Sequence, residues 1–234
     1  MQKTNYGFFY VYVTFRFMKK ILLFALMVGC AIAGYAQNLK IAKLKYHGGG
    51  DWYANKTALP NLIDFCNRNL NMEIEEQDDE VDISSNELFL YPYLYMTGHG
   101  NVVFSTSEAE NLRTYLLAGG FLHIDDNYGL DQFIRLEMKK VFPELEFVEL
   151  PFNHPIYHQK YNFDNGLPKV HEHDGERPQG LGLMYEGRLV CFYSYQSDLG
   201  NGWEDQHIYD DPEYVRQEAL KMGANIITYC FTRE

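Results

Sequence analysis

The sequence is poor in cysteine and in basic residues. It contains 4 cysteines among 234 residues, and no two of them form a Cys-x-x-Cys motif. Cys66, Cys191 and Cys230 follow residue 36, and this odd number permits at most one disulfide among them. Free thiols buried in the core are the alternative, because Cys66 and Cys191 stand beside apolar residues.

Lysine and arginine are outnumbered by acidic residues. Four of the 20 basic residues and none of the 32 acidic ones lie in residues 1–36. The 16 bases and 32 acids that follow give a formal charge of −16. Phosphate binding needs clustered basic side chains, so such a surface repels nucleic acid and anionic lipid. We expect no nucleic-acid partner.

Common catalytic and phosphate-binding motifs are also missing. Neither Gly-x-Cys-x-Gly nor Gly-x-Ser-x-Gly occurs, although an activated nucleophile normally stands on a tight strand-to-helix turn with small neighbours. The Gly48-Gly49-Gly50 run lacks the Lys-Ser/Thr of a phosphate loop. Nucleophilic catalysis and nucleotide binding therefore have little support.

Residues 18–36 have the three parts of a secretory signal peptide. Two lysines form a charged start, an apolar core follows, and a small-x-small cleavage site ends at Ala36. The apolar run is too short for a comfortable membrane span. We expect cleavage after Ala36, no stable membrane span afterwards, and export to the periplasm or envelope of a Gram-negative-type bacterium. An uncleaved anchor and a lipoprotein attached through Cys30 are the alternatives.

The segments on either side of this signal are interpreted separately. Residues 1–17 fit none of its three parts, so we interpret them as a mis-called N-terminal extension. Residues 37–234 are long enough for one α/β domain with a well-buried core.

Apolar periodicity predicts alternating strands and helices in residues 37–234. Strands are expected over 39–44, 88–97, 121–124 and 146–150, and helices over 59–70, 105–116, 130–141 and 215–230. A hairpin is expected over 183–195. The acidic segment 73–82 is interpreted as a solvated connection, and 151–180 as a long polar loop. Strands separated by helices indicate a mostly parallel sheet covered on both faces.

In open α/β sheets, ligands bind beyond the carboxyl ends of the strands. Three predicted strand ends carry glycine or polar residues, in segments 48–52, 98–100 and 125–127. Asp125 and Asp126 are candidates for acid–base catalysis or for a divalent cation, whereas capping of the turn is their structural alternative. The expected ligand-binding residues are Gly49, Asp51, Trp52, His99, Asn127 and Arg177.

The polar loop supplies further candidates. His171 and His173 are two residues apart, so on an extended segment both could bind a metal ion together with Asp126. An exposed polar loop is the simpler interpretation of the same residues. His154 precedes a proline and is either part of a packing turn, a metal ligand or a catalytic base.

The two tryptophans, Trp52 and Trp203, each stand beside an acidic residue in a glycine-bearing segment. Aromatic rings stack on sugars while carboxylates accept bonds from sugar hydroxyls, so carbohydrate is one candidate ligand. Tryptophans that fill gaps between a loop and the core are the commoner alternative.

Four ordered motifs resemble an uncharacterised bacterial family, domain of unknown function 4159. They are Tyr46-His47-Gly48-Gly49-Gly50-Asp51-Trp52-Tyr53, Gly119-Gly120-Phe121-Leu122-His123-Ile124-Asp125-Asp126, His154-Pro155-Ile156-Tyr157 and Ala219-Leu220-Lys221-Met222-Gly223-Ala224-Asn225-Ile226. The likeness extends over about residues 39–232. It implies a flavodoxin-like three-layer fold similar to that of class I glutamine amidotransferases, and a role in an envelope assembly. It implies no established activity.

Two functions from different classes follow. The first is an exported envelope domain that binds a small polar, sugar-like ligand or an envelope protein partner, without glutamine amidotransferase activity. The alternative is a metal-assisted hydrolase or isomerase acting on a carbohydrate-like substrate, with Asp125 or Asp126 and the loop histidines as its active groups.

Overall fold

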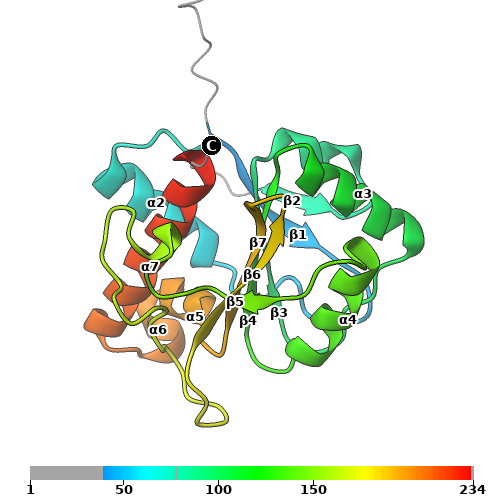
Figure 1. Cartoon of the computed structure of the whole chain (residues 1–234). Helices are drawn as coiled ribbons and strands as arrows, with labels where there is room; N and C mark the ends of the chain where they lie inside the picture. Colours follow the sequence, from blue (N-terminus) through cyan, green and yellow to red (C-terminus); the bar gives the residue numbers. More distant parts are fainter. Residues whose placement is uncertain (1–38, 77–78, 233–234) are drawn as a thin grey trace, which may run out of the picture. The chain divides into compact units, whose positions relative to one another are not determined.

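A seven-stranded sheet forms the centre of the computed structural model, which describes residues 39–76 and 79–232 (Figure 1). These residues belong to one compact unit, Asn38–Glu234. The expected extension 1–17 and signal peptide 18–36 lie outside the described residues. None of the helices described is long and apolar enough to cross a membrane.

The strands follow the order β2-β1-β3-β4-β7-β6-β5. The first five pair in parallel, and β6 and β5 extend the sheet through antiparallel pairs. Their bounds are Ile41–Lys45 (β1), Asp79–Asp82 (β2), Tyr93–Gly98 (β3), Phe121–Asp126 (β4), Val148–Glu149 (β5), Gln179–Tyr185 (β6) and Arg188–Tyr195 (β7). Every residue of β3 and β4 is buried, as expected for central strands covered on both faces.

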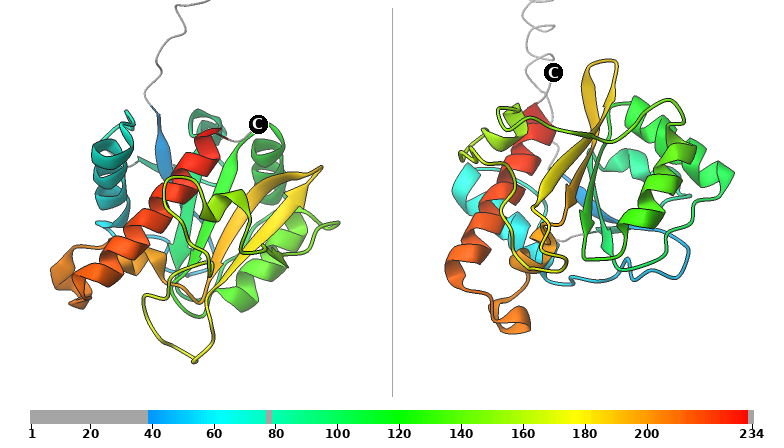
Figure 2. Two further views of the ribbon diagram at one scale, coloured as in Figure 1. Left: turned by 60° about the vertical axis from the view of Figure 1, so that its left-hand side comes forward. Right: turned by 60° about the horizontal axis from the view of Figure 1, so that its bottom comes forward.

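Helices cover both faces of this sheet. Figure 1 shows α2, α5 and α7 on one face and α3 and α4 on the other, and Figure 2 shows α7 lying across its face. The bounds are Ala58–Leu70 (α2), Thr106–Leu117 (α3), Asp131–Val141 (α4), Leu199–Trp203 (α5), Gln206–Tyr209 (α6) and Glu213–Thr232 (α7), with short 3₁₀ helices at Asn86–Leu90 (η1) and Pro155–Tyr157 (η2). Two apolar cores therefore lie against the sheet, one on each face. The arrangement is a flavodoxin-like three-layer α/β fold.

Several elements follow directly from local sequence signals. Ser105 and Glu108 form a capping box at the start of α3, because each side chain accepts the backbone N–H of the other residue. The predicted hairpin is the antiparallel β6–β7 pair. The more specific likeness to class I glutamine amidotransferases stays a prediction.

Other segments differ from the sequence-based expectation. Segment 73–82 is not only a connection, because Asp79–Asp82 forms the edge strand β2. The predicted strand 88–97 begins with the 3₁₀ helix η1, so β3 starts at Tyr93. Backbone pairing with β1 creates β2 despite its acidic side chains, and only Val81 within it is buried. Helices α5 and α6 were not expected.

The long loop before β6 is fixed at its first half by α7. The buried side chain of Asn225 accepts hydrogen bonds from the backbone N–H groups of Lys160 and Tyr161 and donates one to the Tyr161 carbonyl oxygen. Such bonds satisfy backbone groups that the loop could not otherwise pair. The second half of the loop, residues 167–178, is consequently the part that reaches the ends of the strands.

Candidate functional site

The carboxyl ends of β1, β3, β4 and β7 form one edge of the sheet, here called the carboxyl edge. Between β1 and β3 the strand order reverses, since the chain continues from β1 outward to β2 and then returns to β3. Ligands of open α/β sheets bind outside such switch points. A ligand is therefore expected at the loops that follow β1 and β3.

Asp51 and His99 meet at this switch point. Asp51 lies in the loop after β1, and its Oδ2 lies 2.9 Å from the Nδ1 of His99. Its other oxygen, Oδ1, accepts the backbone N–H of His99. The two side chains remain 33% and 52% exposed, so this Asp51–His99 pair faces solvent.

Glycines allow the two loops to approach each other this closely. The N–H of Gly50 donates to the carbonyl oxygen of Asn101 at 2.9 Å, and a Cβ on Gly50 would lie 2.7 Å from that oxygen. Gly98 has φ +138°, and a Cβ there would lie 2.3 Å from the Tyr46 hydroxyl. Larger residues would therefore separate Asp51 from His99. Gly49, with φ +92°, has open space around it.

Asp125 is fully buried, and its carboxyl group is used within the protein. It accepts bonds from the Ser194 hydroxyl at 2.5 Å, from the Tyr95 hydroxyl at 3.3 Å and from two backbone N–H groups at the start of α5. Burial raises its pKa to about 7, although the bonds from Ser194 and Gly200 oppose that shift. Asp125 thus joins β4 to β7 and α5 rather than facing a ligand.

A buried hydrogen-bonded chain continues from Asp125 into the core. The Nε2 of His123 lies 2.9 Å from the Ser194 hydroxyl, and its Nδ1 lies 2.8 Å from the Tyr93 hydroxyl. Burial lowers the pKa of His123 to about 3, so its ring is neutral at ordinary pH. Its two contacts fit one tautomer, with Tyr93 donating to Nδ1 and Nε2 donating to Ser194.

Asp126 and Asn127 are likewise held by internal contacts. Asp126 Oδ1 accepts the N–H groups of Tyr128 and Leu130 at 2.9 and 3.0 Å, which is the turn-capping role that the sequence allows for. Asp126 Oδ2 accepts from Tyr193 at 3.2 Å, and burial raises the pKa of Asp126. The side-chain amides of Asn127 and Asn55 form two hydrogen bonds with each other, and each side chain donates one.

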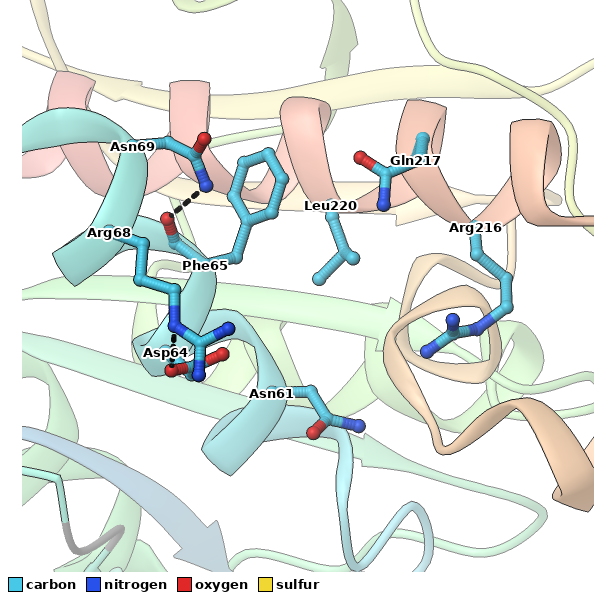
Figure 3. A pocket seen from close by; sticks show the side chains of 8 residues that line it. All are labelled: Asn61, Asp64, Phe65, Arg68, Asn69, Arg216, Gln217 and Leu220. Atoms are coloured by element: carbon cyan, nitrogen blue, oxygen red, sulfur yellow. Dashed lines mark hydrogen bonds and ion pairs between the residues drawn. The ribbon is translucent and has the colours of Figure 1, made fainter.

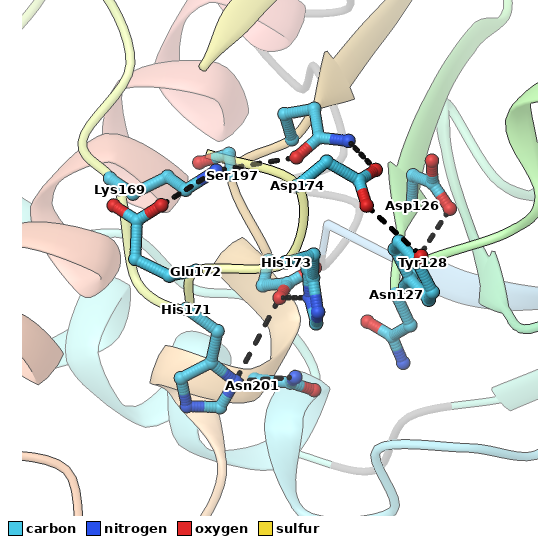
Figure 4. A network of polar contacts seen from close by, with 12 residues as sticks. Asp126, Asn127, Tyr128, Lys169, His171, Glu172, His173, Asp174, Ser197 and Asn201 are labelled. Atoms are coloured by element: carbon cyan, nitrogen blue, oxygen red, sulfur yellow. Dashed lines mark hydrogen bonds and ion pairs between the residues drawn. The ribbon is translucent and has the colours of Figure 1, made fainter. Parts of the chain in front are cut away.

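The loop before β6 brings further polar residues to the carboxyl edge (Figure 4). The His173 ring stacks on Tyr128 with centroids 4.6 Å apart, and the Tyr128 hydroxyl donates to Asp174 at 3.0 Å. His173 Nε2 also contacts the carboxylate of Asp198. We call these residues, together with His171, the edge cluster. Tyr128 has φ +94°, an uncommon conformation for an aromatic residue and one that aims its ring at this loop.

Asp198 is the most unusual member of the edge cluster. It is fully buried, its Oδ1 has no hydrogen-bond partner in the part of the chain that the structure describes, and burial raises its pKa to about 7. His171 Nδ1 lies 3.8 Å from Asp198 Oδ2, whereas His171 Nε2 lies 3.0 Å from Asp211. Gly98 of β3 pairs with Asp126 of β4 in the sheet, so His99 at the switch point and Tyr128 of the edge cluster follow neighbouring strand ends.

Sequence reasoning missed Tyr128 and Asp198. Both follow predicted strands directly, Tyr128 after β4 and Asp198 after β7. The strand-end rule that selected His99 would have selected them too, had it been applied to the end of the hairpin and to the whole turn after Asp126.

The candidate metal ligands are not gathered at one point. Within residues 39–76 and 79–232, no group of three or more His, Cys, Asp or Glu side chains has a geometry that could hold a metal ion. His154 packs on Tyr229 of α7, with ring centroids 5.5 Å apart, and Tyr229 lies beside Phe121 at the opposite end of β4 from Asp126. His154 therefore lies outside the edge cluster, and its Nδ1 accepts the N–H of Ile156.

The other expected ligand-binding residues are dispersed. Trp52 packs against the core beneath α3 and α4, with Lys45 Nζ 5.1 Å from its ring centroid. Arg177 forms a two-point ion pair with Glu149 of β5, at 2.6 and 2.7 Å. Trp203 is fully buried and donates to a carbonyl oxygen of α7, as the packing alternative predicts.

A cavity lies between α2 and α7, away from the carboxyl edge (Figure 3). Its volume is about 350 Å³, and its cationic residues are Arg68 and Arg216. Arg68 pairs with Asp64 at 2.7 Å, and Arg216 donates to the carbonyl oxygen of Glu204 at 2.7 Å. Because these charges are already paired within the protein, the cavity offers less to a ligand than the carboxyl edge does.

Comparison with known proteins places this chain in a family. No curated protein matches it. The sequence pattern of the family described as Domain of unknown function (DUF4159) matches residues 40–231, which is nearly all of the part that the structure describes. The chain therefore belongs to the domain of unknown function 4159 family.

Proposed function

We propose that this protein is an exported, envelope-associated binding domain whose carboxyl edge takes a small, neutral, hydroxyl-rich ligand such as a sugar. The observation that carries the proposal is the half-exposed Asp51–His99 pair at the strand-order switch point, beside the edge cluster. Carboxylates and imidazoles both form hydrogen bonds with hydroxyl groups.

Exposed aromatic side chains near these polar groups support a sugar-like ligand. Tyr53, Tyr128 and Tyr209 are 56%, 47% and 42% exposed. The Tyr209 ring packs against His171 of the edge cluster, with ring centroids 5.0 Å apart. Rings with polar tips suit ligands that are partly apolar and partly hydroxylated.

The charge of the carboxyl edge favours a neutral ligand over an anionic one. Asp51, Asp174 and Asp198 contribute carboxylates here, and the amino group of Lys169, in the loop before β6, contacts Gln196 and Glu172. A phosphate or carboxylate ligand would need clustered basic groups instead.

The positions of the cysteines support a function other than glutamine amidotransfer. Cys66, Cys191 and Cys230 are buried, and burial raises the pKa of Cys66 to about 12. A reactive cysteine needs exposure and a stabilised thiolate. The signal-like segment 18–36 supports export, and the acidic surface agrees with a partner other than nucleic acid.

Isothermal titration calorimetry with a panel of neutral mono- and disaccharides tests the proposal. The expected result is saturable binding of at least one sugar, weakened about tenfold or more by Asp51→Asn, because a hydrogen bond to a charged group contributes about 1.5–3 kcal/mol. Asp64→Asn, in the cavity between α2 and α7, is the matched control and should bind normally. Failure of every sugar to bind, or loss of binding in the control alone, would contradict the proposal.

A further inference from the structure

The Asp51–His99 pair has the geometry of an oriented imidazole base. Asp51 uses one oxygen to hold the His99 backbone N–H and the other to hold Nδ1. Within the described residues, Nε2 of His99 makes no hydrogen bond, and the side chain is 52% exposed. A carboxylate on Nδ1 fixes the ring with Nε2 unprotonated and stabilises the cation that forms when Nε2 takes a proton.

The backbone around this pair is fixed before any ligand arrives. Gly50 N–H donates to Asn101 O at 2.9 Å, Asn101 Nδ2 donates to Gly48 O at 3.0 Å, and Val103 N–H donates to His47 O at 2.8 Å. These bonds join residues 47–50, which precede Asp51, to residues 101–103, which follow His99. Groups held in place before reaction lose little free energy to reorganisation, which is what a catalytic base needs.

We propose that His99 is a general base that hydrolyses carboxylic esters of neutral, hydroxyl-bearing molecules, with Asp51 as its positioning residue. This activity rests on the proposed function, because the alcohol part of the ester is the ligand that the carboxyl edge binds. No metal ion and no protein nucleophile is required.

The reaction balances with water as the second reactant. His99 Nε2 accepts a proton from water while the water oxygen bonds to the ester carbonyl carbon. Collapse of the tetrahedral intermediate breaks the bond between that carbon and the alcohol oxygen, which takes the proton from Nε2. One carboxylic acid and one alcohol leave, and His99 returns to its neutral form.

A second histidine in the same protein provides a matched control. His47 Nδ1 lies 2.7 Å from Glu108 Oε1, and its side chain is 63% exposed. It thus has the same kind of carboxylate partner as His99. Glu108, however, belongs to the capping box of α3, and His47 has no contact with the edge cluster among the residues described. Of these two exposed histidines, His99 is the one that lies at the switch point of the strand order.

The test measures ester hydrolysis by the protein expressed from the full chain, with p-nitrophenyl acetate and 6-O-acetylglucose as substrates. We expect His99→Gln to lower kcat about 100-fold, within the range for loss of a general base. Asp51→Asn should lower kcat about tenfold or more with both esters, and it should raise KM about tenfold for the acetylated sugar alone, because Asp51 also binds the sugar. His47→Gln should leave both constants unchanged, and thermal unfolding of each variant checks that it is folded.

Separate results would overturn the activity and the binding function. Equal hydrolysis by wild type and His99→Gln, or no hydrolysis of either ester by wild type, overturns the general-base proposal. Calorimetry with glucose on the same samples shows whether the binding function survives. Sugar binding without hydrolysis would leave the proposed function standing and reject the activity alone.

Discussion

The two halves of the carboxyl edge use their acidic side chains in different ways. At the ends of β4 and β7, Asp125 is fully buried and Asp126 is 3% exposed, and both accept several bonds from the protein itself. At the ends of β1 and β3, the Asp51 side chain is 33% exposed and holds a single histidine. Asp125 and Asp126 are therefore structural, whereas Asp51 is accessible to a ligand.

The difference follows from where each carboxylate lies along the chain. Asp125 and Asp126 are the last residues of a central strand, so the layers on either side of the sheet bury them. Burial of a carboxyl group is tolerated when hydrogen-bond donors surround it. Asp51 lies six residues after β1 in a loop over the sheet edge, where solvent remains in reach. Position on strand or loop thus decides which acid is available for chemistry.

The largest predicted loss of stability comes from substituting Asp125, in the buried half of the carboxyl edge. Asp125→Ala should lower the free energy of unfolding by about 3 kcal/mol or more, because it leaves Ser194 and two N–H groups of α5 without their acceptor. Asp51→Ala should cost less than about 1 kcal/mol, since its pair is exposed. Urea unfolding of both variants makes the comparison. Equal losses would refute the division into a structural and an available half.

The second-largest predicted loss of stability comes from substituting the glycines of the switch point. Gly98→Ala should cost about 2–3 kcal/mol, because φ +138° strains alanine and its Cβ would collide with the Tyr46 hydroxyl. Gly49 also has a positive φ, but its surroundings are open, so Gly49→Ala should lower the free energy of unfolding by only about 1 kcal/mol. Urea unfolding distinguishes them. A Gly98→Ala protein as stable as wild type would show that the loops need no close approach.

The pH dependence of stability should report on Asp198. Burial raises its pKa from 3.8 to about 7, so between about pH 4 and pH 7 the folded protein holds a proton that the unfolded chain has lost. Its contribution to the free energy of unfolding therefore falls as pH rises through that window, by up to about 1.4 kcal/mol per pH unit. Asp198→Asn removes this contribution.

Unfolding of both proteins at several pH values isolates the effect of Asp198. The stability of Asp198→Asn relative to wild type should rise from pH 4.5 to pH 7. The lowered pKa of His173, caused first by burial, acts in the opposite direction and is present in both proteins. A difference that does not vary with pH would mean that Asp198 is ionised throughout this window.

The smallest predicted effect is local. His173→Ala removes the stacking on Tyr128 and the contact with Asp198, and it should lower global stability by less than about 1 kcal/mol. Hydrogen exchange should nevertheless quicken in residues 169–176, while the segment fixed by Asn225 keeps its protection. Unchanged exchange in residues 169–176 would show that other contacts hold the edge cluster together.

Much of the fold could be predicted from sequence patterns because the central elements are strongly apolar. Helices α2, α3, α4 and α7, the hairpin and the buried strands β3 and β4 follow from periodicity and capping. Strand β2 could not be predicted, since Asp79, Glu80 and Asp82 resemble a solvated segment and only backbone pairing makes them a strand. Edge strands of this kind depend on a neighbour that local sequence does not reveal.

The site could be predicted only in part. The strand-end rule selected Asp51 and His99, which the structure brings together, but it gave equal weight to Asp125, whose carboxyl group is occupied internally. His154 was grouped with the other histidines, although the fold places it against α7. Burial and hydrogen-bond supply depend on tertiary packing, so they separate these residues only in the folded protein.

Backbone amide NMR during titration with a neutral sugar locates the ligand site on the protein. We expect chemical-shift changes concentrated at residues 48–52 and 98–101, with smaller ones at 128 and 171–174, because these segments surround the Asp51–His99 pair and the edge cluster. Chemical-shift changes confined to α2 and α7 would contradict a ligand site at the carboxyl edge and would place the site in the cavity of Figure 3 instead.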